Sequence, residues 1–159
     1  TFEQNYGGVE GDSASMAEAL AILSDLSGLP LRQDLAITGS MNQLGDAQAI
    51  GGAHHKIEGF FRSCVESGAL TGSQGAVVPQ ANEQNLILRD EVAEAVAEGK
   101  FHIWSVATIE EAAELFMGIP AGEVGADGRY PEDTVYGHVQ AELEAFDRAL
   151  YERERMSPQ

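Results

Sequence analysis

The chain has 159 residues, which is enough for one domain with a buried core. Its 26 Asp and Glu against 9 Lys and Arg give a formal net charge of −17. Such a charge argues against binding to nucleic acid or to anionic membrane surfaces, because their phosphates would repel the chain. The one cysteine, Cys64, excludes an internal disulfide, and no signal peptide or long apolar run is apparent. We therefore expect a cytoplasmic location and no membrane contact.

The N-terminal part predicts a strand, a helix and a second strand. Residues 1–6 alternate weakly and begin without methionine, which indicates a strand cut out of a longer polypeptide. A helix is expected over about 13–27, ending at Gly28, and a strand over 35–38. The helix is predicted from apolar residues at helical spacing: Met16, Leu20, Leu23 and Leu26.

The middle of the chain predicts a hairpin over residues 40–52, with its turn near Gly45, and then a helix over about 53–67. A short buried strand over 76–79 is expected next. One side of the predicted helix should face the core through Ile57, Phe60, Phe61, Cys64 and Val65.

Beyond that strand, residues 83–98 show a mostly helical pattern that is interrupted near Arg89, and Asn82 is the expected cap. Residues 101–106 predict a strand in which Trp104 is a packing residue. Thr108 begins a capping box that predicts a helix to about residue 117.

This alternation predicts an α+β fold with mixed sheets, some parallel pairing and helical crossovers. We expect a domain over residues 1–118, a linker rich in Gly and Pro over 119–131, a C-terminal helix over 132–155 and a frayed tail over 156–159. The last helix carries a narrow apolar stripe that needs a partner surface, on its own domain or on a neighbouring subunit. The stripe consists of Val135, Val139, Leu143, Phe146 and Leu150.

Ser13 is the candidate nucleophile, because it follows a glycine-rich segment and precedes a predicted helix. Backbone N–H groups at a helix start and the positive end of the helix dipole can stabilise an oxyanion. The alternative is a helix cap, since Ser13, Ser15 and Asp12 are all residue types that often occupy this position.

Lys56 is the candidate base, because a serine needs a base within hydrogen-bond reach and a lysine can serve only as a neutral amine. It is one of only two lysines in the sequence. Apolar residues follow it, so we expect partial burial, which disfavours the charged form. The alternative is a lysine whose stem covers apolar surface while its amine reaches water.

These residues carry a resemblance to a known family. The segment over residues 6–79 resembles the proteolytic domain of the Lon family of ATP-dependent Ser-Lys proteases. It is most similar to the branch with Glu-Gly-Asp-Ser-Ala-Ser at the nucleophile, found in archaeal-type Lon and in bacterial Lon-related proteins. Further matches lie in residues 27–39, 50–56 and 78–82, and the resemblance fades after Gly118.

The resemblance implies the compact α+β Lon fold and a role for each matching residue. Ser13 becomes the nucleophile and Lys56 the general base, while Thr38 helps to hold the lysine. Backbone N–H groups around Asp12 and Ser13 become the oxyanion donors. Glu10 matches an acidic position; a carboxylate touching Lys56 would favour the charged amine, so Glu10 is expected to gate the site.

The pair His54–His55 departs from many relatives and raises the question of a metal. His102 and His138 are distant in sequence, and no Cys or carboxylate stands at zinc-like spacing, so we expect a solvated helix start and no metal. The two histidines could steepen the pH dependence of activity between about 6 and 7, where histidine titrates.

The sequence thus predicts a serine endopeptidase that hydrolyses unfolded proteins as the proteolytic part of a larger Lon-related protease. The chain has no phosphate-binding loop and no expected cofactor, so ATP would act through the ATPase-type region that precedes this domain in the family. Hexameric rings are also implied by the resemblance. The rival hypothesis is a non-catalytic Lon-like domain for assembly or peptide docking. An unrelated hydrolase would need a Gly-x-Ser-x-Gly or Ser-x-x-Lys signature, and the sequence has neither.

Overall fold

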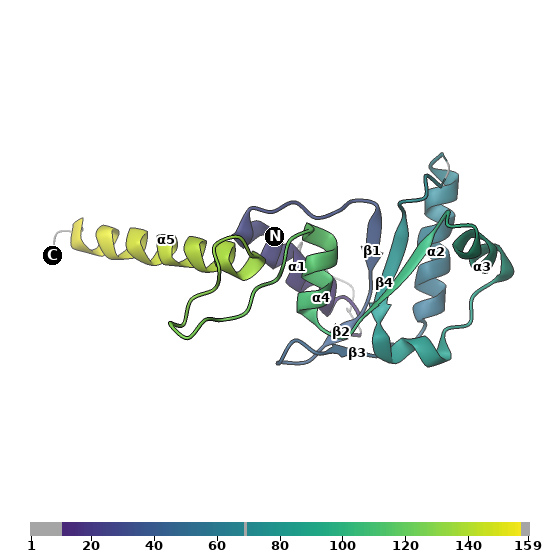
Figure 1. The fold of residues 1–159 in the computed structure, drawn as a ribbon, viewed down its shortest axis with the longest axis horizontal. Helices are drawn as coiled ribbons and strands as arrows, with labels where there is room; N and C mark the ends of the chain where they lie inside the picture. The colour runs from purple at the N-terminus through teal and green to yellow at the C-terminus, as the bar shows by residue number, and fades with distance from the viewer. Residues whose placement is uncertain (1–10, 69, 157–159) are drawn as a thin grey trace, which may run out of the picture.

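The computed structural model describes residues 11–68 and 70–156, and it has the predicted α+β class (Figure 1). The predicted strand over residues 1–6 and the tail over 157–159 lie outside the described residues. The elements in chain order are α1 (Ser15–Ser27), β1 (Leu35–Ile37), β2 (Ser40–Met41), β3 (Ala47–Gln48), α2 (Ala53–Glu66), β4 (Gly75–Pro79), the 3-10 helix η1 (Gln80–Asn85), α3 (Asp90–Ala97), β5 (His102–Val106), α4 (Ile109–Met117) and α5 (Val135–Met156).

A three-stranded sheet with the order β1-β4-β5 forms the centre of the fold. Both pairs are parallel, with Leu35 opposite Gly75 and Gly75 opposite His102. Parallel strands need crossover connections, and these run through α2 before β4 and through α3 before β5. The predicted hairpin is β2–β3, which pairs Ser40 with Gln48 in antiparallel fashion. The carboxyl ends of all three parallel strands therefore meet at one edge of the sheet.

Apolar clusters cover both faces of this sheet, because successive side chains of β4 point to opposite sides. Val77 belongs to one cluster, while Ala76 and Val78 belong to the other. Figure 1 shows α1 and α4 on one side of the strands and α2 and α3 on the other. The buried members of the first cluster are Met16, Leu20, Leu35, Val77, Val106, Ile109, Ala112, Ala113 and Phe116. Those of the second are Ile57, Phe61, Ala76, Val78, Val92, Ala95 and Phe101.

Several predicted element boundaries are confirmed. Gly28 has φ +67° and ends α1 in the left-handed region, where a side chain would be strained. Thr108 accepts a hydrogen bond from the Glu111 N–H at 3.3 Å and so caps α4. The interruption near Arg89 separates η1 from α3.

Helix α2 differs from the prediction in its last turn. Ile57 and Phe61 are buried, but Val65 is 48% exposed and Cys64 is half-buried. A helix of 14 residues is about 21 Å long, whereas the 5 residues of β4 span about 16 Å. The helix therefore extends past the sheet, and Val65 lies beyond the surface that would bury it.

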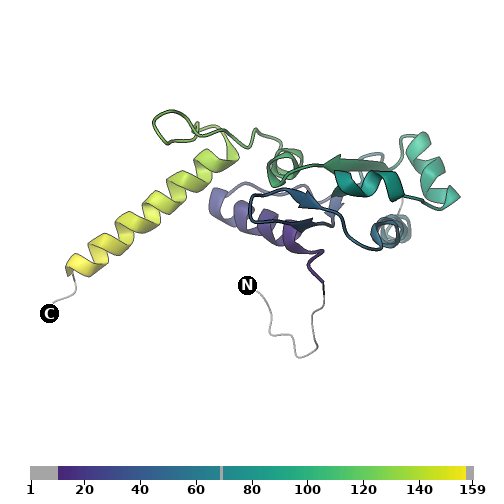
Figure 2. The same cartoon turned by 90° about the horizontal axis from the view of Figure 1, so that it is seen from below.

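Helix α5 extends away from the rest of the molecule, as both views show (Figure 2). Its first turn packs against the body, where Val135 is fully buried and the Tyr136 hydroxyl donates to Glu110 Oε1 at 2.9 Å. The preceding segment is tied to it by the ion pair between Arg129 and Glu144 at 2.9 Å. Within the described ranges, no helix combines the length and the apolar character that crossing a bilayer requires.

Candidate active site

Ser13 lies in the loop just before α1, and its side chain faces Lys56. The distance between Ser13 Oγ and Lys56 Nζ is 2.5 Å. The N-cap of α1 is Ala14, with no side-chain cap bond, and the Ser15 hydroxyl donates back to the Asp12 carbonyl at 2.6 Å. Neither serine therefore caps the helix through its side chain, and the Ser13 hydroxyl is directed at an amine.

Thr38 completes a small polar network with these two residues. It follows β1 directly and is 9% exposed. Its Oγ1 lies 3.0 Å from Lys56 Nζ and donates to the Ser13 carbonyl oxygen at 3.2 Å. The Thr38 N–H donates to the Val77 carbonyl of the central strand at 3.1 Å. The sheet therefore fixes Thr38, and Thr38 contacts both other residues.

Gly39 holds the serine loop against the end of β1. Its N–H donates to the Ser13 carbonyl at 2.9 Å, and its own carbonyl accepts from the Met16 N–H at 3.2 Å. A Cβ at this position would lie 2.6 Å from Met16 Sδ and 2.9 Å from Pro79 Cγ. The close approach of these segments thus requires a residue without a side chain.

Asp12 is part of the same loop, and its carboxylate accepts a hydrogen bond from the Ser40 hydroxyl at 2.6 Å. Ser40 is 3% exposed and begins β2. The Asp12 side chain therefore ties the serine loop to the hairpin. Glu10, the expected gate, lies outside the described residues.

Lys56 is exposed, which corrects the prediction of partial burial. Its apolar neighbours Ile57 and Phe61 are 1% and 7% exposed, so they occupy the face of α2 that points into the core. Lys56 lies in the first turn of α2, on a different face. The exposed Gly51 and Gly52 just before the helix have no side chains that could cover the lysine. Apolar residues next in sequence therefore do not bury a helical residue on another face.

The histidines that suggested a metal lie in several places. His54 and His55 have ring centroids 4.0 Å apart, while His138 lies on α5 and His102 Nε2 contacts the Gly72 carbonyl at 2.8 Å. Among the described residues, no three His, Cys, Asp or Glu side chains are grouped so that they could hold a metal ion.

Asn82 has a position that sequence reasoning missed. It lies in η1, and α3 begins after Arg89 without a side-chain cap, so Asn82 is not the predicted helix cap. Its side-chain amide instead bonds both backbone polar groups of Ile50, in the loop that leads to α2. The available signal was its place just after a buried strand, because site residues of parallel sheets gather beyond the strand ends.

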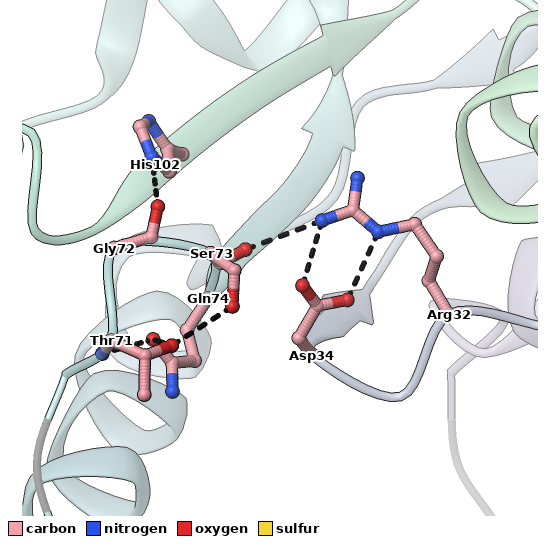
Figure 3. A network of polar contacts seen from close by, with 7 residues as sticks. All are labelled: Arg32, Asp34, Thr71, Gly72, Ser73, Gln74 and His102. Carbon is pink, nitrogen blue, oxygen red and sulfur yellow. Dashed lines mark hydrogen bonds and ion pairs between the residues drawn. The ribbon is translucent and has the colours of Figure 1, made fainter.

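A second polar network lies at the opposite edge of the sheet, where the strands begin (Figure 3). Arg32 binds Asp34 through two hydrogen bonds of 3.0 and 2.7 Å and reaches the Ser73 carbonyl at 3.4 Å. The Arg32 guanidinium holds the pKa of the Asp34 carboxyl below its usual range. Asp34 precedes β1 and Ser73 precedes β4, so this network joins the strand starts and is separate from the Ser13 site.

Comparison with known proteins places the sequence in a family. The model of the Lon protease (S16) C-terminal proteolytic domain matches residues 7–118. A Lon protease homolog of Escherichia coli (strain K12) is 50% identical over 119 residues, which cover 75% of this chain and 20% of that protein. A second homolog, from Haemophilus influenzae, is 48% identical over 117 residues, covering 74% and 19%. An archaeal Lon protease of Thermococcus kodakarensis is 40% identical over 116 residues, covering 73% and 16%.

The chain therefore belongs to the Lon protease family and contains a Lon-type proteolytic domain, which is a peptidase domain. It spans about a fifth or less of the length of these relatives.

Proposed function

We propose that the chain is a serine endopeptidase in which Ser13 is the nucleophile and Lys56 the general base. The contact between Lys56 Nζ and Ser13 Oγ at 2.5 Å is the observation that carries the proposal. A base must lie within hydrogen-bond reach of the group whose proton it takes, at most about 3.2 Å between heavy atoms, or act through one water, and this contact meets that condition.

Proton transfer and bond making follow from this pair. Lys56 takes the hydroxyl proton as Ser13 Oγ attacks the peptide carbonyl carbon, and the carbonyl oxygen becomes an oxyanion. The lysine ammonium then protonates the leaving amine as the C–N bond breaks, which leaves an acyl-enzyme ester. Lys56, neutral again, takes a proton from the water that attacks the ester carbonyl, and it returns this proton to Ser13 Oγ as the Oγ–acyl bond breaks and the acid product leaves. Backbone N–H groups at Asp12 and Ser13 are the proposed oxyanion donors.

Thr38 orients the lysine in this mechanism. Its hydroxyl proton is directed at the Ser13 carbonyl, so its oxygen faces Lys56 as an acceptor. A neutral amine has two N–H donors and one lone pair. When one N–H donates to Thr38, the lone pair is free to point at the Ser13 hydroxyl.

Exposure of Lys56 bears on when the site is active. A lysine acts as a base only when its amine is neutral. We infer that bound substrate or a neighbouring subunit covers the pair and removes water during catalysis. An exposed lysine in the single chain is compatible with this requirement.

Family membership supports the remaining parts of the proposal. The substrates are unfolded polypeptides, the working form is a homo-oligomeric ring in the cytoplasm, and any dependence on ATP resides in a region outside this chain. The competing function is a non-catalytic Lon-like domain for assembly or peptide docking.

Hydrolysis of an unfolded protein and of short fluorogenic peptides tests the proposal. Ser13→Ala and Lys56→Ala should each lower kcat by at least about 1,000-fold, as removal of one member of a catalytic unit does. Ser63→Ala, on the same helix as Lys56, and Lys100→Ala, at the other lysine, are matched controls that should stay active. Activity that survives in both site variants would show that Ser13 and Lys56 are not the catalytic pair, whereas a parent chain without activity would favour the docking function.

A further inference from the structure

Asn82 makes a paired contact with one distant residue. Its Oδ1 accepts from the Ile50 N–H at 3.0 Å, and its Nδ2 donates to the Ile50 carbonyl at 2.8 Å. Asn82 is 9% exposed, and every member of the contact is at least partly buried. One amide therefore satisfies both backbone polar groups of a residue 32 positions away, as a neighbouring strand would.

Ile50 lies immediately before the turn that starts α2. The Gly52 carbonyl accepts from the N–H groups of His55 at 3.0 Å and Lys56 at 3.4 Å. The two residues between Ile50 and α2 are glycines, which have no side chain to pack against the body. Gly52 has φ +68°, and no atom lies within 4 Å of an ideal Cβ at Gly51. The backbone that leads into the first turn of α2 is therefore fixed by the hydrogen bonds at Ile50.

Asn82 connects this path to the strand that fixes Thr38. It follows β4 closely in η1, and Val77 of β4 accepts the Thr38 N–H at 3.1 Å. Both partners of Ser13 are thus connected by hydrogen bonds to β4 or to the segment that follows it. Thr38 is connected through Val77, and the helix turn that carries Lys56 is connected through Ile50 and Asn82.

We propose that Asn82 is a positioning residue that places the Lys56 amine against Ser13 and Thr38; this inference rests on the proposed Ser-Lys function. The contact needs a donor and an acceptor on one short side chain. Asp keeps the acceptor but sets a carboxylate against the Ile50 carbonyl, and Leu removes both bonds. A misplacement of about 1 Å at a catalytic group can cost about 100-fold in rate.

Steady-state kinetics of Asn82→Leu and Asn82→Asp test the proposal, with Asn42→Leu as a matched control. Asn42 also bonds two backbone groups, the N–H of Leu44 and of Asp46, but at the turn between β2 and β3. We expect kcat to fall at least about tenfold in both Asn82 variants, with KM changed less than about twofold. In the control, kcat should fall less than about threefold. Hydrogen exchange of the Ile50 amide should speed up in Asn82→Leu and not in Asn42→Leu.

Two results would overturn the inference while leaving the proposed function intact. One is a kcat in Asn82→Asp and Asn82→Leu within about twofold of the parent chain, when Ser13→Ala and Lys56→Ala are inactive. The other is an equal loss in Asn42→Leu, which would mark a general loss of stability. Activity in Ser13→Ala or Lys56→Ala would instead overturn the proposed function itself.

Discussion

At the scale of single residues, the site joins three segments that are far apart in the sequence. Ser13 comes from the loop before α1, Thr38 from the end of β1 and Lys56 from the first turn of α2. Thr38 is the member whose oxygen contacts both others, at 3.0 Å to the lysine amine and 3.2 Å to the serine carbonyl. The Thr38 hydroxyl can be removed with little change of shape, because valine has nearly the shape of threonine.

Replacing Thr38 tests its proposed role. Thr38→Val keeps the shape but removes the acceptor for Lys56, so we expect kcat to fall about 10–100-fold, within the range that general acid–base groups contribute. Thr38→Ser keeps the hydroxyl and should retain most activity. Thermal unfolding is the control, because an unpaired buried group costs about 1–3 kcal/mol. Equal activity of the Val and Ser variants would remove Thr38 from the mechanism.

Site candidates with a local signal could be predicted from the sequence, whereas contacts that depend on distant packing could not. Ser13 and Lys56 stand in short motifs, and the structure brings their side chains together. The place of Asn82 just after a buried strand was visible in the sequence, but its contact with Ile50 was not, because the two residues are 32 positions apart. The exposure of Lys56 depends on which face of α2 turns to the core. The prediction of partial burial was wrong because it rested on apolar residues that are next in sequence but lie on another face.

At the scale of elements, the parallel sheet separates two polar networks. The candidate site lies at the carboxyl edge, where Thr38 follows β1, and the Arg32–Asp34 pair lies at the amino edge (Figure 3). The strands, the hairpin and most helix boundaries were predictable because period and turn residues are local signals. The exposed end of α2 was not, since it depends on the relative lengths of a helix and a strand.

The amino-edge network predicts a pH-dependent stability. Arg32 lowers the pKa of Asp34 in the folded chain, so the pair stabilises the fold above the unfolded pKa of about 3.9 and ceases to do so as pH falls through the folded pKa. Both side chains are partly exposed, at 39% and 28%, so the effect should not exceed about 1 kcal/mol.

Urea unfolding of Asp34→Asn at several pH values checks this expectation. The variant should be less stable than the parent chain at pH 7, and the difference should shrink as the pH is lowered from about 5 to about 2. Glu98→Gln, which removes a carboxylate from an exposed ion pair, controls for the change in net charge. A deficit that stays constant or grows on acidification would refute the role of the Arg32–Asp34 pair.

At the scale of the whole molecule, α5 extends away from the body (Figure 2). The stripe begins at the fully buried Val135, but Leu143 and Phe146 are each 49% exposed and Leu150 is 60% exposed. Only the start of the helix thus docks on its own domain. The sequence did not decide whether the stripe packs on its own domain or on another subunit. In the structure, the start of the stripe packs on the domain and the rest is exposed.

This division predicts unequal effects of truncation along α5. Val135→Ala should lower the free energy of unfolding by about 2 kcal/mol, because it leaves a cavity in packed surroundings. Phe146→Ala should change it by no more than about 0.5 kcal/mol, as surface substitutions do. Urea unfolding at two chain concentrations measures both. A large, concentration-dependent loss in Phe146→Ala would show that another copy covers the stripe.

Covalent labelling with a serine-reactive fluorophosphonate tests whether Lys56 activates Ser13. Mass spectrometry of the digested adduct reads out the modified residue, and the time course gives the rate. We expect an adduct on Ser13 that forms at the parent rate in Lys100→Ala and far more slowly in Lys56→Ala. Absence of a Ser13 adduct, or labelling of Ser13 that is equally fast without Lys56, would contradict it.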